Sequence, residues 1–220
     1  MCYGRLMPRK KRDFQQERSE RTYRAILEAA ATVFPKKGFE GTQMSDIADA
    51  VGLSVGAVYR YFDDKRELFL EMVETELAAT RADINARFTP ENFIGSTPED
   101  AVAGVLDILF DRVKKDAAMT RVYLAMSMSD PDVAKIRKDG EIHDRALLAN
   151  VIRAVTAGTI GDADAAALVI ERAVIGAAVD CVIGTKVVSE AAAKAALQKM
   201  IVRYLLGGPP STSTAAPKQR

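Results

Sequence analysis

Apolar residues recur at helical spacing along most of the chain, and no stretch alternates apolar and polar positions as a half-buried strand would. In the first segment Ile26, Leu27, Ala30, Val33 and Phe34 form a single apolar stripe. The following run PKKGFEGT contains one proline and two glycines, and this predicts the end of that helix. The pattern therefore predicts an all-α fold.

Residues that start and stop helices divide the rest of the chain. A short helix is predicted from Met44 to Val51, closed by Gly52, and Ser54 has the chemistry to cap the next short helix. The helix that opens at DDKREL is expected to continue to Phe88. After the break TPENFIGSTPED, further helices are predicted at about 98–115, 117–128, 131–156, 163–184 and 189–206.

Charge is concentrated at the start of the chain, although the net charge of the 220 residues is only +1. Residues 1–24 hold eight basic and three acidic side chains. Such a basic arm is typical of a protein that places one end on a polyanion, and a solubilising disordered tail would explain the same charges. No apolar signal segment follows the basic start, charged residues interrupt the most apolar run, and the two cysteines match no metal or redox spacing. We therefore expect a cytoplasmic protein with no membrane span.

Two short helices joined by a tight turn, at 44–62, are typical of a helix-turn-helix. Six apolar residues meet the packing demand of this pair: Ile47, Ala48, Val51, Leu53, Val58 and Phe62. The outer face is then left with Gln43, Ser45, Val55, Gly56, Ala57, Tyr59, Arg60 and Tyr61.

This outer face makes little sense for a purely structural helix. Gly56 inside a helix costs about 1 kcal/mol relative to alanine, and two tyrosines would face water. In a major groove the same residues are useful, because glycine allows close approach and the tyrosine hydroxyls and Arg60 can bind phosphate or base edges. Lys65, at the start of the next helix, can pair with the same DNA backbone. The helix pair therefore predicts a DNA-binding surface.

The stretch GTQMSDIADAVGLSVGAVYRYFDDKRELF closely resembles the DNA-binding signature of the TetR family of bacterial transcriptional repressors. The matching positions are Thr42, Ile47, Ala48, Gly52, Leu53, Ser54, Gly56, Tyr59, Phe62, Lys65, Leu68 and Phe69. The resemblance adds Thr42 and Ser54 to the candidate DNA contacts. It implies an all-helical homodimer whose middle helices enclose a small-molecule pocket and which leaves a palindromic operator when the ligand binds. Gln43, Ser45, Val55 and Tyr61 depart from the common pattern, and of these Gln43 and Val55 bear on which operator is read.

These features predict four segments: a flexible basic arm (1–18), a helix-turn-helix DNA-binding domain (19–66), a helical effector-binding and dimerisation domain (67–206) and a disordered tail (207–220). The candidate pocket residues are Phe88, Phe110, Met119, Tyr123, Met126 and His143, each of which could equally be core or surface. The last two helices are apolar on most sides, which favours pairing with a second copy, although cover by the middle helices would explain the same pattern. The candidate interface residues are Leu168, Ile175, Val179, Val182, Leu197, Ile201 and Tyr204.

Catalysis is not expected, because the sequence contains a single histidine, no nucleophile–base constellation and no phosphate loop. No cofactor or metal site is expected either. The predicted partners are double-stranded operator DNA, an unidentified small-molecule effector and a second copy of the chain. Two alternatives stay open at this stage: a DNA-binding regulator without a small-molecule effector, and an activator in place of a repressor.

Overall fold

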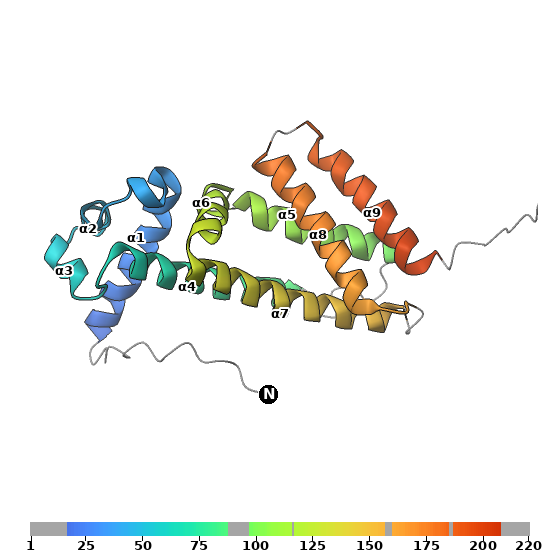
Figure 1. Cartoon of the computed structure of the whole chain (residues 1–220), viewed down its shortest axis with the longest axis horizontal. Helices are drawn as coiled ribbons and strands as arrows, with labels where there is room; N and C mark the ends of the chain where they lie inside the picture. The colour runs from blue at the N-terminus through green and yellow to red at the C-terminus, as the bar shows by residue number, and fades with distance from the viewer. Residues whose placement is uncertain (1–16, 88–96, 116, 157–159, 185–186, 208–220) are drawn as a thin grey trace, which may run out of the picture. The chain divides into compact units, whose positions relative to one another are not determined.

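The computed structural model describes residues 17–87, 97–115, 117–156, 160–184 and 187–207, and this part of the chain is helical with no strand (Figure 1). The all-α prediction is confirmed. The helices are α1 (Glu17–Gly41), α2 (Met44–Val51), α3 (Val55–Tyr59), α4 (Lys65–Arg87), α5 (Pro98–Lys115), α6 (Ala117–Ser129), α7 (Pro131–Val155), α8 (Ala163–Val182) and α9 (Glu190–Leu206). The basic arm up to residue 16, Phe88 and the tail after Gly207 lie outside the described residues.

The predicted punctuation between α2 and α3 is confirmed. Gly52 is left-handed, with φ 67°, and its N–H donates to the carbonyls of Ala48 and Asp49. The Ser54 hydroxyl accepts a hydrogen bond from the Ala57 N–H at 3.2 Å and so caps α3. These two residues set the sharp angle between the helices, because one ends α2 and the other begins α3 within three positions.

The first helix ends at Gly41, within the predicted run PKKGFEGT. Pro35 lies inside α1, since its fixed φ is compatible with a helix although it supplies no N–H donor. The break comes at Gly38, where φ is 73° and ψ is 169°. A side chain is strained at such a φ, so glycine suits this kink, and three helical residues follow it up to Gly41.

The chain folds into two compact units, and the divisions between them fall inside helices. The first unit runs to Ala79 and also takes in Ala118–Lys135, which is most of α6 and the first turn of α7. Its interior contains an aromatic cluster in which the Phe34 ring lies 5.0 Å from Phe69, and Phe39 lies 5.2 Å from the same ring. The side chains of Ile47, Val58 and Phe62 are buried, so α2 and α3 are packed by residues that the sequence assigns to this task.

The second unit contains Thr80–Ala117 and Ile136–Arg220. Its core is built by α5, α8 and α9, which pack against one another, with two residues of α7. Buried members of this core are Leu106, Phe110, Val113, Ala149, Ile152, Ala163, Ala166, Ala167, Ile170, Val174, Ala178, Leu197 and Ile201. The run of alanines in α8 allows its neighbours to approach closely. No helix in the described parts of the chain has the length and apolar character needed to cross a membrane.

Candidate nucleic-acid interface

The start of α2 is held by a reciprocal arrangement around Asp46. One carboxylate oxygen of Asp46 accepts the backbone N–H of Gln43 at 2.9 Å, and the other accepts the Lys37 ammonium at 2.6 Å. The Lys37 hydrogen bond, together with the Gln43 N–H, holds the pKa of Asp46 below its ordinary value of 3.8. The Ser45 hydroxyl lies 3.4 Å from the Gln43 side-chain oxygen. Gln43 is therefore exposed at the start of α2, where the negative charge of Asp46 is already paired with Lys37.

Thr42 precedes this helix start and lies inside the unit. Only 1% of its surface is exposed, and its hydroxyl donates to the Gly38 carbonyl at 2.7 Å. That hydrogen bond satisfies a carbonyl at the kink of α1. Thr42 therefore has almost no surface to offer a ligand and acts on the position of α2 instead.

The outer face of α3 presents a small residue beside aromatic and cationic ones. A Cβ added to Gly56 would meet no atom within 4 Å, so the space above it is open. Tyr59 is 48% exposed and Val55 is 37% exposed, while Arg60 and Ser54 are also exposed. Ala57 is half-buried on the same short helix. The sequence-predicted residues of this segment are therefore accessible, with Ala57 only in part.

Tyr61 lies outside the helix and contacts α1. Its hydroxyl is 3.3 Å from the Ser19 hydroxyl, and the neighbouring Phe62 stacks on Tyr23 with ring centroids 5.2 Å apart. The half-buried Tyr61 therefore holds the residues just after α3 against α1.

Lys65 is half-buried and its ammonium binds the end of α1. Its ammonium donates to the Phe39 carbonyl at 2.7 Å and to the Glu40 carbonyl at 3.4 Å, and it lies 4.5 Å from the centre of the Phe39 ring. A cation at these carbonyls complements the negative end of a helix. The sequence predicts that Lys65 contacts DNA phosphate. In the structure its ammonium links the start of α4 to the end of α1.

Two charged contacts in this unit are absent from the sequence predictions: Lys37 with Asp46, and Arg66 with Asp130 and Asp132. A local pattern signals the capping role of Asp46, an acidic residue three positions after the N-cap Gln43, but does not signal its contact with Lys37. The second joins residues 64 and 66 positions apart, and no local pattern signals it.

The candidate pocket residues divide between the two units. Met119 and Met126 are buried on α6 in the first unit, and Tyr123 is half-buried on the same helix. Phe110 is fully buried in the core of the second unit, where the Lys194 ammonium lies 5.0 Å from its ring centre. His143 is exposed on α7. Among the described residues of this set, only Tyr123 and His143 keep appreciable accessible surface.

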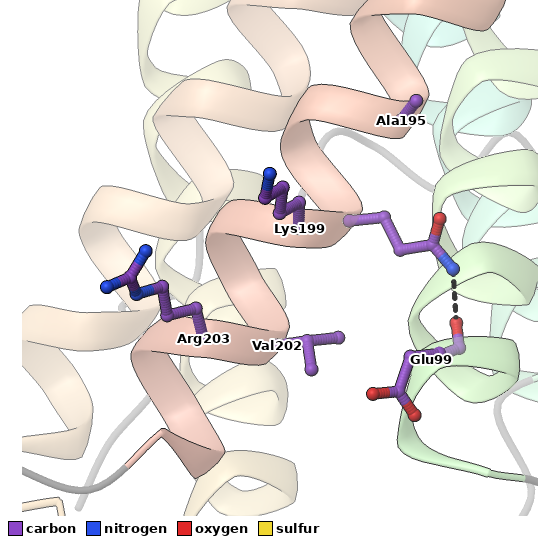
Figure 2. Close-up of a pocket in the computed structure, with 6 residues that line it drawn as sticks. Glu99, Ala195, Lys199, Val202 and Arg203 are labelled. Atoms are coloured by element: carbon purple, nitrogen blue, oxygen red, sulfur yellow. Dashed lines mark hydrogen bonds between the residues drawn. The ribbon is translucent and has the colours of Figure 1, made fainter.

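A groove of about 410 Å³ lies elsewhere in the second unit, between α9 and the first turn of α5 (Figure 2). The Gln198 side chain crosses it and donates to the Glu99 carbonyl at 2.8 Å. Its lining consists of Glu99, Ala195, Gln198, Lys199, Val202 and Arg203. None of the sequence-predicted pocket residues lines it.

The candidate interface residues also separate into two groups. Leu197 and Ile201 point into the core of the second unit. Ile175, Val179 and Val182 are half-buried, whereas Leu168 is 40% and Tyr204 is 51% exposed. The exposed apolar surface also includes Val169 and Met200.

The Asp46 contacts predict a specific pH dependence. Because the pKa of Asp46 is lowered in the folded protein, its stabilising contribution is complete above the unfolded pKa, about 3.9, and is lost as the pH falls through the lower folded pKa. Asp46→Asn is therefore expected to lower the free energy of unfolding at pH 7, with the difference from the parent shrinking below pH 4. Urea titrations of both proteins across pH 3 to 7 measure this, and a constant difference would contradict it.

Comparison with known proteins agrees with this geometry. The family model described as "Bacterial regulatory proteins, tetR family" matches residues 26–72, which contain the helix-turn-helix. The chain is 45% identical over 62 residues to the HTH-type transcriptional regulator YfiR of Bacillus subtilis, covering 28% of this chain and 30% of YfiR. It is 28% identical over 132 residues to the HTH-type transcriptional regulator SrpR of Pseudomonas putida, covering 60% of this chain and 55% of SrpR. The matched segment thus spans about half or less of either relative.

Solved structures with little sequence identity share the fold. A transcriptional regulator from Rhodococcus sp. Rha1 superposes with a TM-score of 0.66 at 22% identity, covering 83% of this chain and 97% of that one. The regulator FadR from Bacillus subtilis, solved in complex with stearoyl-CoA, has a TM-score of 0.59 at 18% identity, covering 82% and 97%. The fold and the exposed α3 together define a helix-turn-helix protein. Residues 26–72 carry the DNA-binding domain of the TetR family, and the chain is similar in fold to transcriptional regulators.

Proposed function

We propose that this protein is a ligand-responsive repressor that binds a near-palindromic operator as a homodimer and leaves it when a small molecule binds. The observation that carries the proposal is the accessible face of α3, where open space above Gly56 lies beside the exposed Tyr59 and Arg60. A surface of this kind suits a major groove, because the backbone can approach base edges while hydroxyl and guanidinium groups bind phosphate.

Each residue of this face has a distinct proposed role. Tyr59 and Ser54 hold phosphate oxygens, which sets the depth of α3 in the groove. Val55 and Ala57 offer apolar contact to thymine methyl groups, and Arg60 can reach phosphate or guanine. The exposed amide of Gln43, at the start of α2, is a further contact. Lys65 and Thr42 support this face from within, through the carbonyls that they bind.

The dimer is proposed to form through the exposed sides of α8 and α9. On α9 the residues Ala192, Ala196, Met200 and Tyr204 follow at intervals of four and are all exposed. On α8 Leu168 and Val169 are exposed, so they lie on a different side of the helix from its buried core residues. A Cβ at Gly176 would meet nothing within 4 Å, so a partner helix could approach α8 closely there. A two-fold pairing of these faces would cover apolar surface on both copies.

A small-molecule effector is supported by the fold relative FadR, whose structure contains stearoyl-CoA. In this chain α6 is the proposed source of pocket-forming side chains. Its deformable methionines Met119 and Met126 are buried and can repack around different ligands. The half-buried Tyr123 on the same helix is the proposed polar contact.

Selection of bound DNA from random oligonucleotides tests the proposal. The purified full chain is expected to enrich an inverted repeat, with two copies of the chain on each duplex and half-sites separated by one helical turn or more. A thermal-shift panel of metabolites and drugs then tests the effector, and a hit is expected to release the selected DNA. Failure to enrich any sequence would overturn the proposed sequence-specific binding of DNA. A specific operator with no stabilising ligand in the panel would favour regulation without an effector.

A further inference from the structure

The first turn of α4 is joined to the first turn of α7 by a three-bond contact within the first unit. Arg66 donates from Nε to one oxygen of Asp130 at 2.6 Å and from a terminal nitrogen to the other oxygen at 2.9 Å. The same terminal nitrogen donates to Asp132 at 2.6 Å. A two-pronged guanidinium–carboxylate pair of this kind fixes orientation as well as distance. We call Arg66, Asp130 and Asp132 the Arg66 fork.

Asp130 is itself rigidly held. Its Oδ1 accepts the backbone N–H groups of Asp132 at 2.9 Å and Val133 at 3.2 Å, so the carboxylate caps the start of α7. The Asp130 side chain is only 11% exposed, in contrast to 43% for Arg66. The Arg66 guanidinium holds the pKa of Asp130 below its ordinary value. The position of Arg66 is therefore set by the corner between α6 and α7.

The residues next to Arg66 connect this corner to the reading helix. Lys65 binds the last carbonyls of α1, and Asp64 accepts the Glu67 N–H at 2.7 Å at the start of α4. Tyr59, the last residue of α3, is seven positions before Arg66. The short connection between α3 and α4 therefore ends in a turn that is fixed on one side to α1 and on the other to α7.

We propose that Arg66 is a positioning residue for DNA reading, and that the α6–α7 corner at Asp130–Val133 holds the reading helix in place through the Arg66 fork. The inference rests on the proposed DNA-binding function. The division of the chain supports it, because Ala118–Lys135 belongs to the same compact unit as the helix-turn-helix, whereas the helices that flank this segment in sequence do not. Met126 and Val133, which flank this corner, are both buried.

A simpler role for Arg66 would be direct contact with a DNA phosphate, since its side chain is 43% exposed. The two roles predict opposite effects for one substitution, Asp130→Asn. If Arg66 contacts phosphate, removal of the competing carboxylate frees it and strengthens binding. If Arg66 positions α3, loss of the fork loosens the first turn of α4 and weakens binding. Asparagine is itself a good N-cap, so Asp130→Asn removes the two-pronged charged contact and leaves Arg66 only its bond to Asp132, while α7 keeps a capping oxygen.

The experiment compares Asp130→Asn and Arg66→Lys with the full-length parent. The readouts are affinity for the selected operator by fluorescence anisotropy and hydrogen exchange of peptides that cover residues 54–62. Both variants are expected to bind about tenfold more weakly, as a charge-assisted hydrogen bond is lost, and to exchange faster in 54–62. Arg66→Lys keeps the positive charge but cannot form the two-pronged contact. Asp107→Asn is the matched control, because Asp107 is an exposed partner of Lys194 in the second unit.

An Asp130→Asn variant that binds as tightly as the parent, or more tightly, would overturn the positioning role. Unchanged exchange in residues 54–62 would also overturn it. If the parent binds no DNA, the proposed function fails, and the exchange measurement alone still decides whether the fork holds α3. Equal weakening by Asp107→Asn would show a general charge effect and would likewise overturn the proposal.

Discussion

Ala196→Glu is expected to convert the proposed dimer into monomers. Ala196 is exposed at the centre of the α9 face that also carries Met200 and Tyr204. A two-fold interface would bury the new carboxylate on both copies without a partner. An uncompensated buried charge costs about 3–5 kcal/mol, so two of them would raise the dissociation constant by about ten-thousandfold or more.

Sedimentation velocity at micromolar concentration measures this change, and operator affinity is expected to fall with it because both half-sites are no longer bound by one molecule. Ala191→Glu is the matched control. It introduces the same side chain at an exposed position of the same helix, about 140° around the axis from Ala196. An Ala196→Glu protein that sediments as the parent does would place the dimer interface elsewhere.

Tyr59→Ala is expected to weaken operator binding by about a hundredfold without lowering thermal stability. Tyr59 is 48% exposed, so its removal leaves no cavity in the core. A hydrogen bond to a charged phosphate contributes about 1.5 kcal/mol or more, and a dimer would lose it twice. Because phosphates carry no sequence information, the loss is expected on every operator variant to the same degree.

Tyr59→Phe separates the hydroxyl from the ring. It is expected to lose most of the affinity that Tyr59→Ala loses, since the proposed contact is made by the hydroxyl. Fluorescence anisotropy at several salt concentrations and melting temperatures of both variants check this. Parent-like binding by Tyr59→Ala would show that α3 does not enter DNA by this face.

The helix-turn-helix could be predicted from sequence because its determinants are local. Gly52 takes the left-handed conformation and Ser54 caps α3 within a few residues of the helices that they delimit. The packing residues are buried as the sequence predicts: Ile47 and Ala48 on α2, Val58 on α3, and Phe62 in the connection after α3. The end of α1 within PKKGFEGT was also predictable, although the pattern could not tell that the kink falls at Gly38 and not at Pro35, which is compatible with helical φ.

The parts that could not be predicted depend on distant partners. The Arg66 fork and the contact between Lys65 and the Phe39 carbonyl join residues whose proximity only the fold creates. In α8 and α9 nearly every side is apolar, so periodicity could not separate the side that faces the core from the side left exposed. As a result Leu197 and Ile201, predicted at an interface, lie in the core, whereas Tyr204 is exposed.

The discontinuity of the first unit has a consequence during synthesis. Residues up to Ala79 leave the ribosome before the segment Ala118–Lys135 that completes the unit. At about 5–20 residues per second, this delay is roughly 3 to 11 seconds. Throughout that interval the nascent chain carries Arg66 without its carboxylate partners, so the first turn of α4 is not yet fixed to the start of α7. The unit therefore acquires this contact only after more than half of the chain has been made.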